Sequence, residues 1–127
     1  MIKLISLFLI TISLNASMWI TYKEAYEIKD IVNKKAIVII GSENCHYCEK
    51  LLNDIESNND IRNIINNNFI PIYLDKDKDF IPIDLYSTLT PTVYILSNDL
   101  NHILFKSYGY KDIDSFKKIL KETKYVK

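Results

Sequence analysis

The chain has 127 residues, a length typical of one domain that can bury its own hydrophobic core. Lysine and arginine number 16 together, aspartate and glutamate also number 16, and the formal net charge at neutral pH is therefore zero. A chain without net charge has no overall field that would draw it to nucleic acid or to an anionic membrane surface. We therefore expect no nucleic-acid partner.

The first 17 residues have the layout of a secretory signal peptide. Lys3 lies near the start, an apolar run follows over residues 4–14, and two small residues end the segment. An uncleaved membrane anchor is the alternative, but polar residues interrupt the run and a membrane span needs about 20 apolar residues. We therefore expect a signal peptide over residues 1–17, export from the cytoplasm, and one domain over residues 18–127.

The first half of that domain alternates helical and extended patterns. Thr21 and Glu24 have the spacing of a capping box, which predicts a helix that runs to about Asn33. The continuous apolar run from Ala36 to Ile40 predicts a strand that is covered on both faces. The pattern then predicts a turn (41–44), a helix (45–56) and a second helical piece (60–67).

The second half is richer in extended segments. In chain order we expect a strand (69–74), a charged loop (75–79), a short helix (82–89), two strands joined as a hairpin (92–96 and 102–106) and a last helix from Asp112 or Asp114 to about Lys121. A buried strand that is followed by a helical crossover predicts a parallel pair of strands, and the hairpin adds antiparallel ones. The fold class is therefore α/β, with one mixed sheet and helices on its faces.

Both cysteines of the chain, Cys45 and Cys48, stand where the second helix is predicted to begin. Free N–H groups and a partial positive charge at a helix N-terminus stabilise a thiolate, and such cysteines have pKa values of roughly 3.5–7.5. At this spacing the two sulfurs can approach and bond. We expect Cys45, at the exposed first turn, to attack a partner's disulfide and Cys48 to resolve the mixed disulfide.

The two residues between the cysteines are His46 and Tyr47. A protonated His46 would favour the thiolate and make the oxidised pair easier to reduce, which is a redox-tuning role. The alternative is an exposed helix residue with little effect. Tyr47 would present a flat ring at the mouth of the site, or would simply lie on the surface.

Other uses of the cysteine pair need features that this chain has only in part. A structural disulfide is disfavoured because a four-residue ring restrains the unfolded chain little. A zinc site needs four ligands, whereas the chain offers one pair and two histidines, of which His102 is predicted to be a partly buried strand residue. The loop over residues 75–79 lacks the glycine and the glutamate of a calcium loop. We expect no metal and no other cofactor; a copper(I) carrier that uses the two thiolates is the alternative.

Taken together, these elements resemble the thioredoxin superfamily over about residues 22–124. The matching features are a strand at 36–40, Cys-His-Tyr-Cys at the start of a helix, a strand at 69–75, Thr-Pro-Thr at 90–92 before a hairpin, and a terminal helix at 112–120. The resemblance implies a thioredoxin fold, with a mixed central sheet and helices on both faces. It also implies an enzyme, a protein-disulfide oxidoreductase.

The resemblance also assigns roles outside the cysteine pair. In that family the proline matching Pro91 is cis and lies against the cysteines, and the residue before it, here Thr90, helps to dock the substrate chain. The alternative is that Pro91 only begins a strand. Cytoplasmic thioredoxins carry a buried aspartate six residues before the first cysteine, where this chain has Ile39. Proton transfer would then fall to Glu43 or to water.

Within the superfamily, the chain is most similar to small periplasmic thioredoxin-like proteins that keep selected substrates reduced. Tyrosine before the second cysteine and threonine before the proline also resemble exported disulfide isomerases. The resemblance implies a periplasmic reductase of protein disulfides. The sequence shows no nucleotide-binding fingerprint, so we expect electrons from a membrane donor of the thiol type. Nothing in the sequence argues for a stable dimer, so we expect a monomer. An isomerase or oxidase of the same fold is the alternative, and a non-catalytic binding domain is another.

Overall fold

The computed structural model describes residues 17–126. The predicted signal peptide lies outside this range, except for Ser17. Within residues 17–126, no helix has the length and apolar character needed to cross a membrane.

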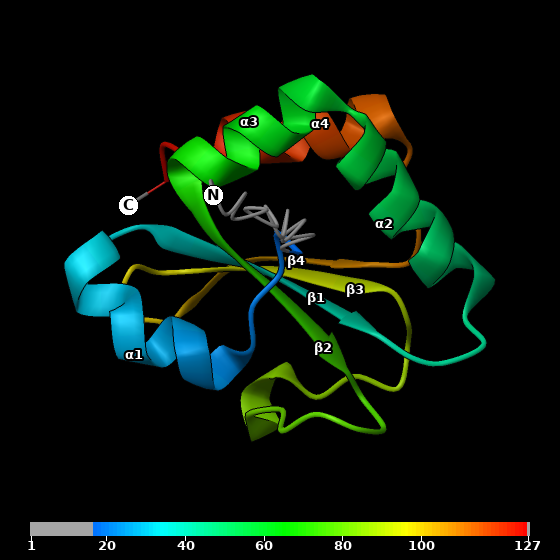
Figure 1. The fold of residues 1–127 in the computed structure, drawn as a ribbon, viewed down its shortest axis with the longest axis horizontal. Coiled ribbons are helices and arrows are strands. Elements are labelled where there is room, and N and C mark those ends of the chain that lie inside the picture. Colours follow the sequence, from blue (N-terminus) through cyan, green and yellow to red (C-terminus); the bar gives the residue numbers. More distant parts are fainter. Residues whose placement is uncertain (1–16, 127) are drawn as a thin grey trace, which may run out of the picture.

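The described residues form one mixed sheet with helices around it (Figure 1). The elements in chain order are α1 (Tyr22–Val32), β1 (Lys35–Gly41), α2 (His46–Ser57), α3 (Asn59–Asn68), β2 (Phe69–Asp75), the short 3-10 turn η1 (Ile83–Leu85), β3 (Thr92–Leu96), β4 (Ile103–Tyr108) and α4 (Ile113–Thr123). The strand order is β2-β1-β3-β4; β1 and β2 are parallel, and the other two pairs are antiparallel. This arrangement confirms the predicted α/β class.

Strand β1 is buried on both sides because helices cover both faces of the sheet (Figure 1). Side chains alternate along a strand, so Ile37 and Ile39 pack in the cluster that includes residues of α2, α3 and α4. Val38 and Ile40 pack in the other cluster, with Ala25 of α1. The predicted cover on both faces of the strand is confirmed, and the structure shows that the apolar run contributes to two separate cores.

The segment before α1 is attached to the sheet and to α2. Ile20 forms a parallel bridge with Ile72 of β2. The indole Nε1 of Trp19 donates a 2.9 Å hydrogen bond to the Glu56 carboxylate, near the end of α2. The Trp19 ring also meets the Tyr73 ring edge-on, with 6.4 Å between the centroids. The start of the described chain is therefore fixed against the same face as the helix that carries the cysteines.

The predicted helix over 82–89 is wrong in extent, because only η1 forms there. The Ser87 hydroxyl donates to the Leu89 carbonyl at 3.1 Å and accepts from the Leu89 N–H at 3.2 Å. Such local bonds from a serine offer the backbone an alternative to the helical ladder. The segment therefore runs as an irregular loop to Thr90.

The prediction that His102 is a partly buried strand residue is also wrong. Strand β4 begins one residue later, and the β3–β4 register shifts between Ile95 and Leu96. Leu100 in the turn has a left-handed backbone with φ of 64°. The His102 side chain is 75% exposed, and its Nδ1 lies 3.7 Å from the Asp99 carboxylate.

Asp99 stabilises this hairpin turn in a pH-dependent way. Its carboxylate accepts hydrogen bonds from the Ser97 hydroxyl at 2.5 Å and from the Asn101 N–H at 3.0 Å, and these lower the pKa of Asp99 from 3.8 to about 2. The pKa of Asp99 is lower in the folded protein than in the unfolded chain, so its carboxylate stabilises the fold at pH values above the unfolded pKa. This contribution is lost as pH falls toward the folded pKa. We expect Asp99→Asn to lose less stability than the wild type between about pH 4 and pH 2. Denaturant midpoints across this range test it, and equal losses in both proteins would contradict it.

Candidate functional site: a cysteine pair at a helix N-terminus

The turn between β1 and α2 places the first cysteine at the helix N-cap. Asn44 has a left-handed backbone with φ of 57°, a conformation that asparagine tolerates better than most residues. Cys45 is the N-cap residue of α2, and its Sγ accepts a 3.2 Å hydrogen bond from the Cys48 N–H. A sulfur atom thus takes the place of the serine or aspartate oxygen that usually caps a helix.

The two cysteines differ in exposure. They form a disulfide, with their Cα atoms 5.2 Å apart. Cys48 is only 1% exposed, whereas Cys45 is partly exposed. A molecule that approaches from solvent therefore meets Cys45 first, and this is the exposure that the predicted roles of the two sulfurs require.

The Thr90–Pro91 segment lies next to the cysteine pair. Its peptide bond is cis, and Pro91 is buried. The Thr90 hydroxyl donates to the Cys45 Sγ at 3.5 Å across 45 positions of sequence. The Pro91 carbonyl accepts from the Gly109 N–H at 2.8 Å, which joins this segment to the end of β4. The fold thus brings Thr90 and Pro91 together with the cysteines.

Ser42 belongs to the same group of residues, although the sequence pattern indicates only a turn residue at this position. Its Oγ lies 3.3 Å from the Thr90 Oγ1, and both side chains are partly buried. The only sequence signal was a short hydroxyl side chain three residues before the first cysteine. That signal is common in turns and does not specify a distant partner.

His46 and Tyr47 both lie on the exposed side of the first turn of α2. Their rings meet edge-on at 5.3 Å, and the Tyr47 ring, which is 57% exposed, also lies 5.9 Å from the Tyr110 ring. Tyr47 is therefore exposed on the helical turn between the two cysteines, and its role at the site stays a prediction. Its contact with Tyr110 was not predicted.

Tyr110 is held against α2 by polar contacts. Its hydroxyl donates to the Asp54 carboxylate and accepts from the Lys50 ammonium at 2.9 Å. The hydrogen bond to Tyr110 is the main cause of a raised Lys50 pKa, so the ammonium stays charged at neutral pH. These contacts fix the chain before α4 to the helix that carries the site.

No carboxylate occupies the position of the buried aspartate beneath the cysteines of thioredoxins. Ile39 is fully buried and pairs with Val93 on one side and with Tyr73 on the other. Glu43, the other proton carrier considered from the sequence, is exposed and forms an ion pair with Lys78 of the charged loop. Its carboxylate is therefore bound to a cation outside the core.

Gly41, at the end of β1, allows a close approach by Tyr73. A Cβ atom at position 41 would lie 1.9 Å from the Tyr73 hydroxyl oxygen, so any other residue would force the ring to move. Burial is the main cause of a raised Tyr73 pKa, with nearby carboxylates adding to it. The Tyr73 hydroxyl therefore remains protonated and uncharged next to the turn that leads to Cys45.

Two further features bear on other possible sites. Among residues 17–126, no three histidine, cysteine, aspartate or glutamate side chains gather where they could share a metal ion. The copper(I) alternative needs only two thiolates, and it stays a prediction.

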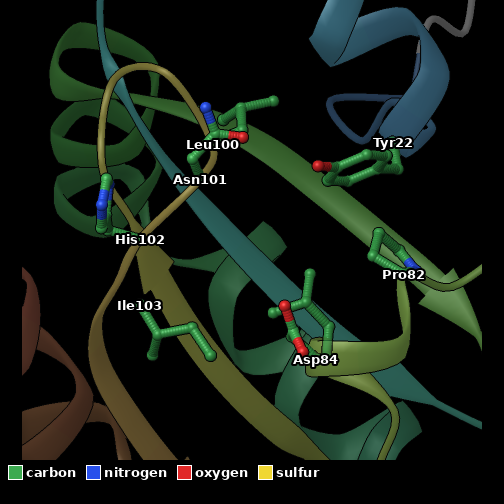
Figure 2. Close-up of a pocket in the computed structure, with 8 residues that line it drawn as sticks. Tyr22, Pro82, Asp84, Leu100, Asn101, His102 and Ile103 are labelled. Atoms are coloured by element: carbon green, nitrogen blue, oxygen red, sulfur yellow. The ribbon is translucent and has the colours of Figure 1, made fainter.

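A separate hollow of about 520 Å³ is lined by Tyr22, by residues 82, 84 and 85, and by residues 100–103 (Figure 2). No predicted site residue lines that hollow.

Comparison with curated proteins identifies a relative that matches about half of this chain. An uncharacterized protein from Archaeoglobus fulgidus is 28% identical over 65 residues, which cover 51% of this chain and 51% of the relative. The match thus spans about half of that relative's length.

Solved structures match more of the chain at lower identity. A thioredoxin from Thermus thermophilus aligns with a TM-score of 0.70 and 19% identity, over 83% of this chain and 85% of that one. The periplasmic thioredoxin SoxS from Paracoccus pantotrophus, in its reduced form, aligns with a TM-score of 0.57 and 19% identity, over 72% of this chain and 96% of that one. At these identities the matches concern the fold alone.

The sequence profile of the thioredoxin-like domain family matches residues 22–124, which include every helix and strand from α1 to α4. The same range contains the cysteine pair and the Thr90–Pro91 segment. The chain belongs to the thioredoxin-like domain family.

Proposed function

We propose that this protein is a thiol–disulfide oxidoreductase that uses Cys45 as nucleophile and Cys48 as resolving thiol. The observation that carries the proposal is the pairing of a partly exposed sulfur at the N-cap of α2 with a buried sulfur one turn further along. Free N–H groups at the helix start favour the thiolate form of Cys45. The burial of Cys48 protects it from partners until a mixed disulfide forms.

The chemistry balances without a cofactor. The Cys45 thiolate attacks a substrate disulfide, forms a mixed disulfide and releases one substrate thiolate. The Cys48 thiolate then attacks the Cys45 sulfur, forms the Cys45–Cys48 disulfide and releases the second substrate sulfur as a thiolate. Two electrons pass from the pair to the substrate. An external dithiol must reduce the pair again, and we propose that a membrane donor of the thiol type does so.

A polypeptide is the substrate class that suits the surface around the cysteines. Tyr47 and Leu89 are both 57% exposed, and Leu89 immediately precedes Thr90, which contacts Cys45. Exposed apolar side chains beside a reactive group favour contact with the side chains of another protein. We propose selected exported proteins as substrates, and a periplasmic location for a monomeric enzyme whose residues 1–17 act as a signal peptide.

The reduction potential of the Cys45–Cys48 pair tests the direction of electron flow. We expect a value near that of thioredoxin, about −270 mV, after equilibration of the protein with glutathione buffers. Quantification of reduced and oxidised protein by mass after alkylation gives the equilibrium constant. A value near about −120 mV would contradict the reductase proposal and would favour an oxidase of the same fold.

A further inference from the structure

Two hydroxyl groups form a chain that ends at the sulfur of the nucleophile. The Thr90 Oγ1 lies 3.5 Å from the Cys45 Sγ and 3.3 Å from the Ser42 Oγ. In the disulfide the Cys45 sulfur carries no hydrogen, so Thr90 must be the donor to it. A hydroxyl has one hydrogen to donate. Ser42 must therefore donate to the Thr90 oxygen, and the direction of both bonds follows.

The other hydroxyls of this region do not compete for Thr90. The Thr92 hydroxyl donates to the Leu89 carbonyl at 2.7 Å and lies 3.1 Å from the Ser87 oxygen. Ser87 in turn is bonded to the Leu89 backbone. Thr92 and Ser87 therefore stabilise the loop before Pro91. Ser42, in the turn after β1, contacts the Thr90 hydroxyl.

When the pair is reduced, the sulfur at position 45 is a better acceptor as a thiolate than as a thiol. A hydrogen bond donated to the charged form of a group favours that form. A donor that itself accepts a hydrogen bond is polarised and becomes a stronger donor. The Cys48 N–H already donates to the Cys45 sulfur at 3.2 Å, and the Thr90 hydroxyl adds a second donor.

We propose that Ser42 is a positioning residue that acts through Thr90: it holds the Thr90 hydroxyl in the orientation that donates to the Cys45 thiolate, and so sets how readily that thiolate forms. The inference deepens the proposed function, on which it rests, because it concerns the reactivity of the same sulfur. The titratable groups next to the pair in the chain are Glu43, His46, Tyr47 and Glu49, and Glu43 forms an ion pair with Lys78. None of them is part of the hydroxyl chain.

The test is the pH dependence of Cys45 alkylation in the reduced protein. Iodoacetamide reacts with the thiolate, and mass analysis identifies the modified cysteine. Hydrogen bonds to charged groups predict that the pKa of Cys45 rises by about one unit in Thr90→Val and by about half a unit in Ser42→Ala. One unit corresponds to about a tenfold smaller equilibrium constant for thiolate formation. Ser42→Thr and Thr90→Ser keep the hydroxyls and should retain values near that of the wild type.

The double variant separates a relay from two independent effects. In the Thr90→Val background, Ser42→Ala should cause no further shift, because its acceptor is already gone. The matched control is Ser87→Ala, which weakens the same loop without removing a member of the chain and should leave the Cys45 pKa unchanged. An equal Ser42→Ala shift in both backgrounds would overturn the proposal, as would an absent shift in the single variant or an equal shift in Ser87→Ala.

The measurement is independent of exchange activity. If the pKa shifts occur but the protein exchanges no disulfides, the proposed function fails and the hydroxyl chain stands. If exchange proceeds and Ser42→Ala leaves the Cys45 pKa unchanged, the hydroxyl chain fails and the proposed function stands. Circular dichroism checks the fold of each variant. Ser42→Gly, compared in the same two backgrounds, replaces Ser42→Ala if the alanine variant does not fold.

Discussion

The Cys48→Ser variant should accumulate mixed disulfides with its polypeptide substrates, and Cys45→Ser should lose disulfide exchange completely. Without the resolving thiol, the bond between Cys45 and the substrate has no internal attacker, so the intermediate persists. Without the nucleophile, the remaining sulfur is 1% exposed and cannot reach a substrate. Reduction of insulin by dithiothreitol gives the rates, and non-reducing electrophoresis with mass analysis identifies the trapped complexes.

The variant that lacks both cysteines is the control for non-specific association. It should form no complex that reducing agent dissociates. Trapping through position 48 in Cys45→Ser, at a rate similar to that of trapping through position 45 in Cys48→Ser, would reverse the proposed roles of the two sulfurs. Full exchange activity in Cys45→Ser would remove the basis of the proposed function.

Ile39→Asp should destabilise the protein by about 4 kcal/mol or more at neutral pH, although aspartate is the residue that thioredoxins carry there. Ile39 is fully buried among apolar side chains such as Ile55 and Val93, and no cation is available to pair with a carboxylate in this cluster of the described residues. Burial raises the pKa of a carboxyl group because the charged form loses its hydration. The folded variant therefore binds its proton more tightly than the unfolded chain does.

The sign of the pH effect follows from that raised pKa. The protonated carboxyl is tolerated below the unfolded pKa of about 3.9, and the penalty grows as pH rises toward the folded pKa. Ile39→Asn is the matched control, because it buries a polar group of the same size that does not titrate. Denaturant unfolding of both variants between about pH 4 and pH 8 should show a steeper loss for aspartate. Parallel curves would mean that the carboxyl at position 39 reaches water.

The elements that the sequence predicts well are those set by neighbouring residues. The capping box of Thr21 and Glu24 begins α1, and an apolar run followed by a turn and a cysteine places the start of α2 within one residue. The run of apolar residues in β1 also predicts that the strand is covered on two faces. Each of these signals acts over a few positions, so no knowledge of distant contacts is needed.

The features that the sequence does not predict depend on contacts between distant segments or on side chains that compete with the backbone. The Ser42–Thr90 contact spans 48 positions, and its formation requires the turn after β1 and the loop before β3 to meet at one end of the sheet. The contact of Tyr47 with Tyr110 has the same origin. The missing helix after Pro82 has a local cause, since the Ser87 hydroxyl satisfies backbone groups that a helix would have used.

Trp19 can serve as an intrinsic fluorescence probe, because it is the only tryptophan in the chain. Its indole is bonded to Glu56 of α2 and touches the Tyr73 ring on β2. Release of the segment before α1 would expose the indole to water and shift its fluorescence emission to longer wavelength. Because α2 begins with Cys45, the same signal would also report whether oxidation and reduction move that helix relative to the sheet.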